Sequence, residues 1–299
     1  MSVMGAGPSR TALWAAGLLA AGIAAAPPAA AQVAPVPRPT VRAYAADSTV
    51  ARAPFGPGEL LTYKVKIGIF NAGEGHMAIP EVDTVRGRDA YHINMAINGG
   101  LGPARVNDRY DSWLDIRTLQ SWRFIQDIHE VNYRSFRHYE FYPERKLWDR
   151  EDNDEFGELG SLLPLDDIAF IYFIRTLPLE VGRTYSFDRY FKGEGNPVSI
   201  QVLRRDRRET DAGTFNTLVV RPIIRTRGLF QGGKAELHLT DDERRILVYM
   251  KSDIKNFPGS LTLHLQSIRE GLPLHPVARD RALRGENREP PEPDTLPWP

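Results

Sequence analysis

The sequence contains no cysteine, and this absence excludes several classes of protein at once. Without thiols the chain has no disulfide framework, no thiolate nucleophile and no site for the lipid attachment of bacterial lipoproteins. Net charge is absent too, because 38 basic residues balance 38 acidic ones. Nucleic-acid-binding proteins carry an excess of Lys and Arg, so the balance argues against that class.

Long apolar runs are scarce, and the one near the N terminus has the features of a secretory signal peptide. Arg10 supplies the positive charge, residues 11–26 form the apolar segment, and Ala29 to Ala31 provide a small-residue cleavage site. This segment is short for a bilayer span and no second one follows. We therefore predict cleavage after Ala31 and a periplasmic or secreted mature chain without a transmembrane segment; an uncleaved anchor is the alternative.

Composition divides the rest of the chain into three parts. Residues 32–57 are rich in Pro and Ala and predict a flexible lead-in. Residues 58–271 predict a single β-rich domain, since 42% of the chain is hydrophobic and can form a core. Residues 272–299 are dominated by Pro and charged residues, which predicts a disordered tail.

One stretch, residues 161–182, combines a helix start, an apolar run and a helix stop. Asp166 or Asp167 can cap the first turn, and Pro178 ends the segment. Residues 168–174 are apolar on every face, which indicates a fully enclosed helix. We expect one central helix from Asp167 to Leu177.

The remainder reads as strands separated by Gly, Pro, Asn and Asp. The clearest is 61–69, where Leu61, Tyr63 and Val65 alternate with polar residues, and the glycines of 71–75 suggest the turn after it. Residues 241–245 predict another hairpin turn. We expect a mainly β protein, an antiparallel curved sheet or half-barrel of about 12–13 strands around the helix. The expected strands are 61–69, 76–82, 91–97, 105–116, 120–128, 133–142, 146–150, 184–191, 198–208, 214–224, 235–240, 246–254 and 260–268.

Four groups of residues in this order resemble a bacterial secreted family known as domain of unknown function 3108. They are 58–63 with 72–75, 167–175 with 179–182, 212–217, and 239–246, and the resemblance spans roughly 55–271. The chain departs from the family pattern at His238, where Trp is expected, and at Leu247, where Pro is expected. The resemblance implies an envelope protein whose sheet wraps a helix, similar to the half-barrels of periplasmic lipoprotein carriers, and it implies no assigned activity.

Signals for catalysis or metal binding are weak, and we predict no catalytic residue, metal site or cofactor. No G-x-S-x-G motif is present. A metal ion could be bound across a hairpin by His129, His138 and Glu140. Polar residues on a solvent-exposed face of the sheet would give the same pattern. Three carboxylates, Asp108, Asp111 and Asp115, are spaced so that they fall on opposite faces of a strand, which disfavours a glycosidase pair. Six arginines of the meander could hold an anionic headgroup or form a solvated face: Arg105, Arg109, Arg117, Arg123, Arg134 and Arg137.

Aromatic residues of the helix and of the meander form the most promising set, either as core or as a lining for sugars or lipids. We expect a non-enzymatic binding or trafficking module for an apolar or amphiphilic, lipid-like envelope molecule, with no nucleic-acid partner. A structural envelope protein without a small ligand is the alternative, and a carbohydrate-binding or carbohydrate-active protein is the second alternative. The oligomeric state stays open. The candidate ligand-binding residues are Phe170, Tyr172, Phe173, Trp113, Trp122 and Phe124.

Overall fold

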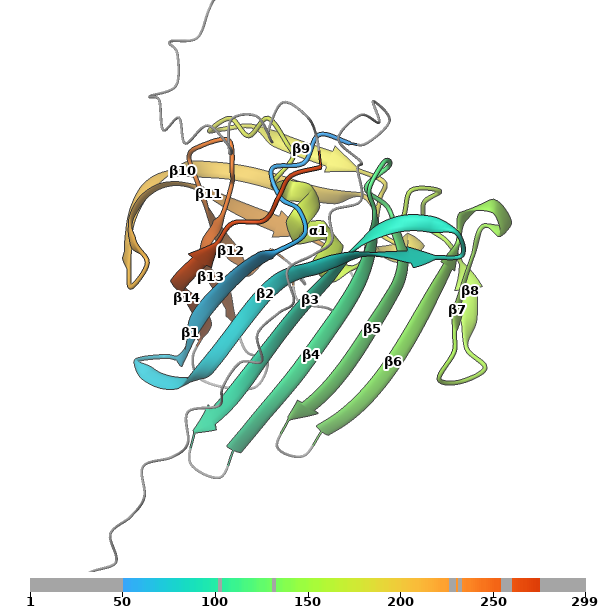
Figure 1. The fold of residues 1–299 in the computed structure, drawn as a ribbon, viewed down its shortest axis with the longest axis horizontal. Coiled ribbons are helices and arrows are strands. Elements are labelled where there is room, and N and C mark those ends of the chain that lie inside the picture. Colours follow the sequence, from blue (N-terminus) through green and yellow to red (C-terminus); the bar gives the residue numbers. More distant parts are fainter. Residues whose placement is uncertain are drawn as a thin grey trace, which may run out of the picture. The chain divides into compact units, whose positions relative to one another are not determined.

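Strands in the described part of the chain form one antiparallel sheet accompanied by a single α-helix, as the sequence predicts (Figure 1). The computed structural model describes residues 51–101, 104–130, 133–225, 230, 233–253 and 260–274. The predicted signal peptide, residues 32–50 of the predicted lead-in and residues 275–299 of the predicted tail lie outside the described residues.

Fourteen strands follow one another through the sheet, and almost all neighbours in the sheet are also neighbours in the sequence. The order is β8-β7-β6-β5-β4-β3-β2-β1-β14-β13-β12-β11-β10-β9, so the β1–β14 pair joins the two ends of the domain. The sheet does not close, because in the described residues the edge strands β8 and β9 are not hydrogen-bonded to each other. The segments that follow these two strands meet only at the isolated bridges Leu159–Lys192 and Leu165–Tyr190. The strands are β1 (Glu59–Ile67), β2 (Phe70–Val85), β3 (Arg88–Leu101), β4 (Ala104–Asp115), β5 (Ser121–Glu130), β6 (Tyr133–Tyr142), β7 (Leu147–Arg150), β8 (Phe156–Glu158), β9 (Thr184–Phe187), β10 (Val198–Thr210), β11 (Gly213–Ile223), β12 (Glu236–Thr240), β13 (Leu247–Asp253) and β14 (Ser260–Arg269).

Helix α1 (Asp167–Ile174) is buried along its whole length, which confirms the prediction of an enclosed helix. It ends three residues earlier than predicted. The amides of residues 175–177 bond to carbonyls three residues back, a tighter turn than the α-helix. Pro178 accounts for this, because proline disfavours the α conformation of the residue before it. The described ranges also contain two short 3₁₀ helices, Pro143–Arg145 and Gly193–Gly195. No helix in these ranges is long and apolar enough to cross a bilayer.

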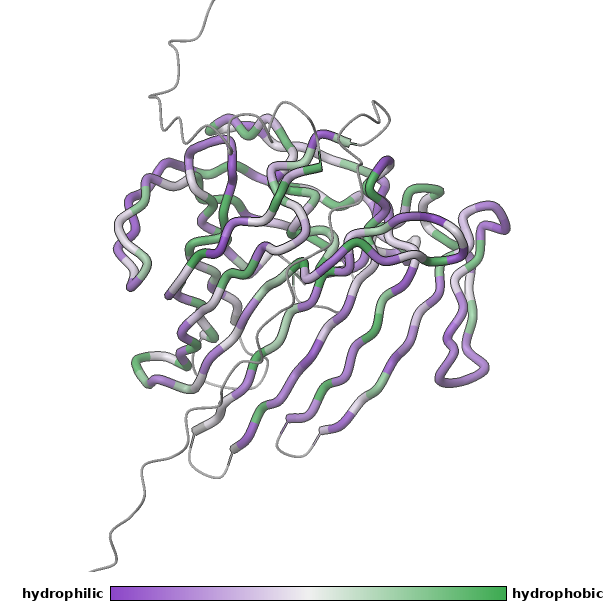
Figure 2. The backbone as a smooth tube through the Cα atoms, viewed as in Figure 1, coloured by the Kyte–Doolittle hydropathy of each residue, from purple (hydrophilic) through white to green (hydrophobic). Residues whose placement is uncertain are grey.

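Alternate residues of each strand face opposite sides of the sheet, which Figure 2 shows as alternating colours along β3 to β6. The inner side chains pack with α1 into one large cluster that draws on both halves of the sheet. A second, small cluster lies on the outer face and consists of Val85, Ala90, Trp113 and Trp122, with Ile125 packed against it.

The first hairpin turn differs from the prediction. The glycine-rich residues 71–75 lie inside β2, and the chain turns earlier, at Gly68 and Ile69. Gly73 and Gly99 bring two strands unusually close, since a Cβ at Gly73 would lie 2.0 Å from the Asn98 carbonyl oxygen. The glycines therefore permit close strand pairing rather than a turn.

Two further differences concern boundaries. The sequence-based count missed β8, a strand of only three residues with a glycine at its centre. The hydrophobic core also extends past the expected domain limits of 58 and 271, because Ala53, Phe55 and Leu274 are buried in the main cluster. The predicted turn at residues 241–245 is confirmed between β12 and β13.

Candidate functional site

Buried acidic groups fix the N-terminal end of α1 to strands β4 and β5. The Asp166 carboxylate caps the helix by accepting hydrogen bonds of 2.9 Å from the amides of Ile168 and Ala169. The Ser112 hydroxyl donates to the same carboxylate at 2.7 Å, and the Asp166 amide donates to Ser121 Oγ at 3.2 Å. This end of the helix is therefore tied to the inner face of the sheet.

Asp167, the first residue of α1, is a second buried carboxyl group. Burial raises its pKa, the charge of Asp166 raises it further, and the resulting pKa is about 7. The Tyr190 hydroxyl donates to Asp167 at 3.2 Å and opposes this rise. Asp167 therefore holds its proton to a higher pH than an exposed aspartate does.

A buried ion pair fixes the opposite end of the helix to β1. Arg175 donates from Nη1 to Glu59 Oε1 at 2.7 Å and from Nη2 to Glu59 Oε2 at 2.8 Å, a bidentate pair between two side chains that are almost fully buried. Burial lowers the pKa of the Arg175 guanidinium, but Glu59 outweighs that effect and the pKa is raised. Arg175 therefore stays charged, with its charge balanced by Glu59.

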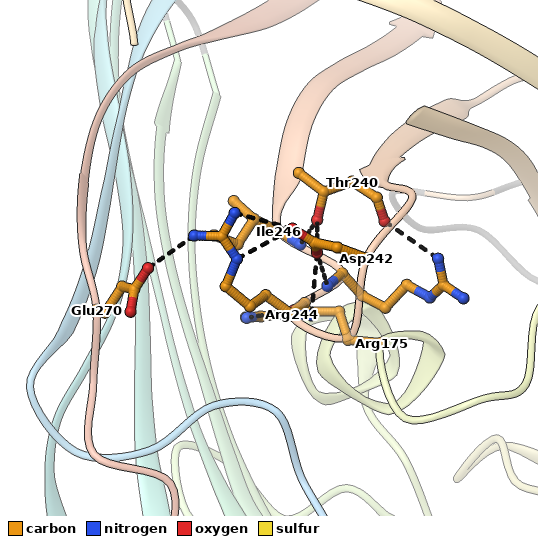
Figure 3. Close-up of polar contacts among 7 residues, drawn as sticks. Arg175, Thr240, Asp242, Arg244, Ile246 and Glu270 are labelled. Atoms are coloured by element: carbon orange, nitrogen blue, oxygen red, sulfur yellow. Dashed lines mark hydrogen bonds and ion pairs between the residues drawn. The ribbon is translucent and has the colours of Figure 1, made fainter. Parts of the chain in front are cut away.

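The turn between β12 and β13 supplies a third partner for Arg175 (Figure 3). Arg175 Nη2 donates to the carbonyl oxygen of Arg244 at 3.2 Å. Asp242 shapes the turn by accepting hydrogen bonds from the Thr240 hydroxyl at 2.6 Å and from the Arg244 amide and guanidinium at 2.8–3.0 Å. Arg244 also forms an ion pair of 2.7 Å with Glu270. Three of the sequence stretches that resemble the family, those containing Glu59, Arg175 and Arg244, thus meet here.

Phe55 packs against this ion pair from the segment that precedes β1. Its ring lies edge-on to Tyr91, with centroids 5.5 Å apart, and edge-on to Tyr172, with centroids 4.9 Å apart. The guanidinium carbon of Arg175 lies 5.1 Å from the centroid of the Phe55 ring. We call the space that this ring occupies between Tyr91, Tyr172 and Arg175 the slot.

Three buried polar atoms of these side chains, Tyr91 Oη, Tyr172 Oη and Arg175 Nε, make no hydrogen bond of regular geometry to a described residue, although the Tyr172 hydroxyl lies close enough to the Glu59 carboxylate for that group to raise its pKa. They belong to the same three side chains that contact the Phe55 ring. Burial raises the pKa of both phenols, so both hydroxyls are neutral. A buried polar group without a partner costs about 1–3 kcal/mol, and the equally buried Tyr63 avoids that cost by donating to the Leu247 carbonyl oxygen at 2.9 Å.

Residues 51–57, which we call the strap, carry Phe55 into the slot. Backbone hydrogen bonds of 2.9 Å hold both ends of the strap, from the Ala51 amide to the Ile116 carbonyl and from the Leu272 amide to the Pro57 carbonyl. Pro54 and Pro57 restrict its backbone. The strap is therefore a restricted segment held by backbone hydrogen bonds near its two ends and by the buried side chains of Ala53 and Phe55.

The sequence-based candidates for ligand binding divide between the two faces of the sheet. Phe170, Tyr172, Phe173 and Phe124 lie in the inner cluster, and only Tyr172 borders the slot. Trp113 and Trp122 lie in the outer cluster, so the structure does not bring all six residues together.

Arginines cover both outer tryptophans. The guanidinium carbon of Arg88 lies 4.6 Å from the Trp122 ring centroid, and that of Arg123 lies 5.2 Å from the Trp113 ring centroid. The indole nitrogens donate to Asp115 and Asp83, each at 2.9 Å. Both rings are thus packed and hydrogen-bonded instead of presenting a stacking platform. A surface hollow of about 420 Å³ lies nearby and is lined by Arg86, Gly87, Arg88, Asp89, Asp115 and Arg117.

The acidic and histidine residues considered for catalysis or metal binding do not come together in one site either. Asp108 lies on the inner face of β4, where burial and Glu130 raise its pKa to about 6, whereas Asp111 and Asp115 belong to the outer face, as their spacing predicts. His138 contacts Glu140 at 3.0 Å, but Glu140 is held by Arg86 and Arg123, and His129 pairs with Asp127. Within the described ranges no three His, Asp or Glu side chains are placed to hold a metal ion.

Besides Tyr172, the two residues of the buried ion pair had signals in the sequence. Glu59 shares the odd-numbered positions of β1 with Leu61, Tyr63 and Val65, so the alternation places a carboxylate on the core face. Arg175 directly follows the apolar helix and is the complementary charge. Phe55 gave no comparable signal, because a single aromatic in a Pro- and Ala-rich segment has no periodicity.

The chain was compared with known sequences, solved structures and protein families. No curated protein sequence matches the chain. Among solved structures, a β-barrel-like protein of domain of unknown function DUF1849 from Brucella abortus aligns over 74% of this chain and 99% of its own, at 8% identity and a TM-score of 0.48. A candidate lipoprotein from Parabacteroides distasonis aligns over 73% of this chain and 99% of its own, at 12% identity and a TM-score of 0.31. A candidate exported protein with a YmcC-like fold from Bacteroides fragilis aligns over 74% of this chain and 100% of its own, at 9% identity and a TM-score of 0.27.

The family comparison is the informative one, and it agrees with the resemblance noted in the sequence. The model of one family matches residues 62–266, which is more than half of the chain and includes every strand from β2 to β13. The protein belongs to that family, described as protein of unknown function (DUF3108).

Proposed function

We propose that this protein is a non-enzymatic binding or trafficking module for an apolar or amphiphilic, lipid-like molecule of the cell envelope, and that the slot is its binding site. The observation that supports this proposal is the coincidence around Phe55. Among the described residues three buried polar atoms form no hydrogen bond of regular geometry, and all three belong to side chains that contact the aromatic ring of Phe55. A folded protein seldom leaves buried polar groups unpaired without a functional reason.

In the proposed cycle the Phe55 ring occupies the slot in place of the ligand. When the strap moves away, an apolar group of the ligand replaces the ring and keeps the slot filled. A polar group of the ligand then bonds to Tyr91, Tyr172 and Arg175. The exchange is favourable because apolar contact is conserved while each new hydrogen bond to a buried group adds about 0.5–1.5 kcal/mol.

The proposed location is the periplasm or the exterior of the cell. This follows from the predicted signal peptide of residues 1–31 and its cleavage site after Ala31. An amphiphile-binding module is useful in that location, because lipids that leave one membrane for another must cross an aqueous space.

A structural envelope protein without a small ligand is the alternative, and one observation favours it. Every residue of α1 is buried, so the helix fills the inside of the sheet. The carbohydrate-active alternative needs two carboxylates facing one cleft, whereas Asp108 and the pair Asp111 and Asp115 lie on opposite faces of β4.

Movement of the strap provides the test. The chain has no cysteine, so an Ala53→Cys variant carries one thiol, at a strap position that is buried. Thiol labelling should accelerate several-fold when laurate, dodecyl phosphate or monolaurin is added. The control is Ala169→Cys, whose thiol would lie within α1, and its labelling should stay slow.

A second pair of variants tests the role of the ring. Phe55→Ala removes the occupant of the slot, so affinity for the best of these probes should rise by about tenfold or more, since a competing group is lost. Phe141→Ala removes an equally buried phenylalanine of the same cluster that does not contact the slot, and affinity should not change. Unchanged labelling of Ala53→Cys with all three probes, together with equal affinities of the two alanine variants, would refute the proposal.

A further inference from the structure

Three hairpins of the sheet, β1–β2, β3–β4 and β5–β6, turn at the same end, opposite the end of β4 to which the strap is bonded (Figure 1). The pairs Gly73–Gly99 and Val106–Glu130 connect one hairpin to the next, so the three turns follow one another in a row. We call this end of the sheet the rim. The last residue pairs before the turns are Ile67–Phe70, Leu101–Ala104 and Glu130–Tyr133.

The β1–β2 turn places large apolar side chains in solvent. Ile69 is 87% exposed, more than any other large hydrophobic residue in the described part of the chain, and the adjacent Phe70 is 60% exposed. Gly68, with a φ of 58°, supplies the special backbone conformation of the turn, so a polar residue would serve equally well at position 69. Tyr133 adds a half-exposed aromatic ring at the β5–β6 hairpin. Two adjacent apolar residues on a protruding turn indicate a contact surface.

Basic side chains lie beside the same turns. The Lys, Arg, Asp and Glu residues within two positions of the last pairs are Lys66, Arg105, Arg134 and Glu130. The three cations alternate with core-facing residues and therefore lie on the outer face, whereas Glu130 shares the inner face with Tyr133 and Val106. The outer side of the rim is therefore positively charged.

These three cations have no ion-pair or hydrogen-bond partner among the residues that the structure describes. Cations farther from the turns differ in this respect, because Lys64 pairs with Asp211 at 2.8 Å and Arg109 pairs with Asp111 at 2.7 Å. The nearest outer-face carboxylate on β5 is Asp127, and it contacts His129 at 3.0 Å. Positive charge at the rim is thus available to an external anionic partner.

We propose that the rim docks on the surface of a lipid bilayer, independently of the slot. Ile69 and Phe70 enter the region of the acyl chains, and the outer cations bind lipid phosphate groups. The order of these residues matches the order of layers in a membrane. Each strand residue rises about 3.3 Å, so the cations lie within about 10 Å of the turns, near phosphate height when the turns reach the acyl chains. Tyr133 suits the boundary between the two layers.

Vesicle binding by the mature protein tests the proposal. The protein should sediment with vesicles of phosphatidylethanolamine and phosphatidylglycerol at low salt and bind vesicles of phosphatidylcholine about tenfold more weakly. Ile69→Ser and Phe70→Ser should each weaken binding about tenfold or more, since each removes a large apolar group from the acyl region. Arg105→Gln and Arg134→Gln should each weaken it about fivefold, and only on the anionic vesicles. All four residues are exposed, so the melting temperatures should not change.

Leu162→Ser is the matched control. Leu162 is 56% exposed, but it lies beside Pro164, whose carbonyl accepts from the Ser121 amide at the opposite end of β5. This variant should bind vesicles as the wild type does. The proposal is overturned if the wild type binds neither kind of vesicle, or if Leu162→Ser and Ile69→Ser lose equal affinity. Dimerisation that Ile69→Ser abolishes, without vesicle binding, would assign the rim to a second copy of the chain and also overturn it.

Discussion

Breaking the Glu59–Arg175 pair is the most direct perturbation of the site, and the structure sets its magnitude. Arg175→Met leaves a carboxylate buried without a counterion, and Glu59→Gln leaves a buried guanidinium without one. Removal of one partner from a buried pair costs about 3–5 kcal/mol. For a domain of this size each kcal/mol lowers the melting temperature by about 2–4 °C, so each single variant should melt roughly 6–20 °C lower than the wild type.

The double variant isolates the interaction between the two side chains from their contacts with other residues. Replacing both charges together, Glu59→Gln with Arg175→Met, removes the unpaired charge that destabilises each single variant. The double variant should therefore lose less stability than the sum of the two singles, with a coupling free energy above about 1 kcal/mol. Urea unfolding followed by circular dichroism measures all four proteins under one condition.

An exposed pair of the same residue types serves as the control. Glu180 and Arg183 form an ion pair of 2.8 Å, but their side chains are 59% and 65% exposed. The corresponding variants there should cost less than about 1 kcal/mol. The reasoning fails if the Glu59 and Arg175 variants are as mild as those of the exposed pair, or if their effects simply add.

Two further predictions concern other parts of the chain. Burial and Asp166 raise the pKa of Asp167 to about 7, so the folded protein keeps a proton that the unfolded chain releases near pH 4, and this stabilisation should be lost as pH rises from about 4 through 7. In urea unfolding Asp167→Asn should therefore gain stability relative to the wild type as pH rises from about 4 to 8, and parallel pH dependences would contradict the assignment. The exported protein should begin at Gln32, which intact mass determines, and a full-length chain in the exported fraction would disprove cleavage.

The fold was largely predictable because its signals are local and repeated. Alternation at Leu61, Tyr63 and Val65 is a property of consecutive residues, and one apolar segment with a cap and a proline indicates one enclosed helix. The glycines of residues 71–75 were misread, because Gly permits both turns and close strand contact. Only the partner strand, far along the chain, distinguishes these two uses.

The site was predictable only in part, because its members come from four distant segments. Glu59 on the core face of β1 requires a buried partner, and Arg175 is the basic residue nearest to the apolar helix, so this pair could have been proposed. Nothing local indicates that Phe55 covers it. Trp113 and Phe124 looked equivalent, since both faces of β4 and β5 carry aromatic and polar residues, and only the register shows which face is inner.

The energetics also indicate which element can move to admit a ligand. Swinging α1 out would expose its seven apolar residues, worth on the order of 10–15 kcal/mol, and would break the contacts at both helix ends. That cost matches the total stability of a typical domain, about 5–15 kcal/mol, so opening the helix amounts to unfolding. Lifting the strap exposes Phe55, about 1.5–3 kcal/mol, together with the smaller buried side chains of Ala53 and Pro57, and breaks three backbone hydrogen bonds of about 1 kcal/mol each. Moving the strap would therefore cost less than moving the helix, which favours the strap as the element that would open to admit a ligand.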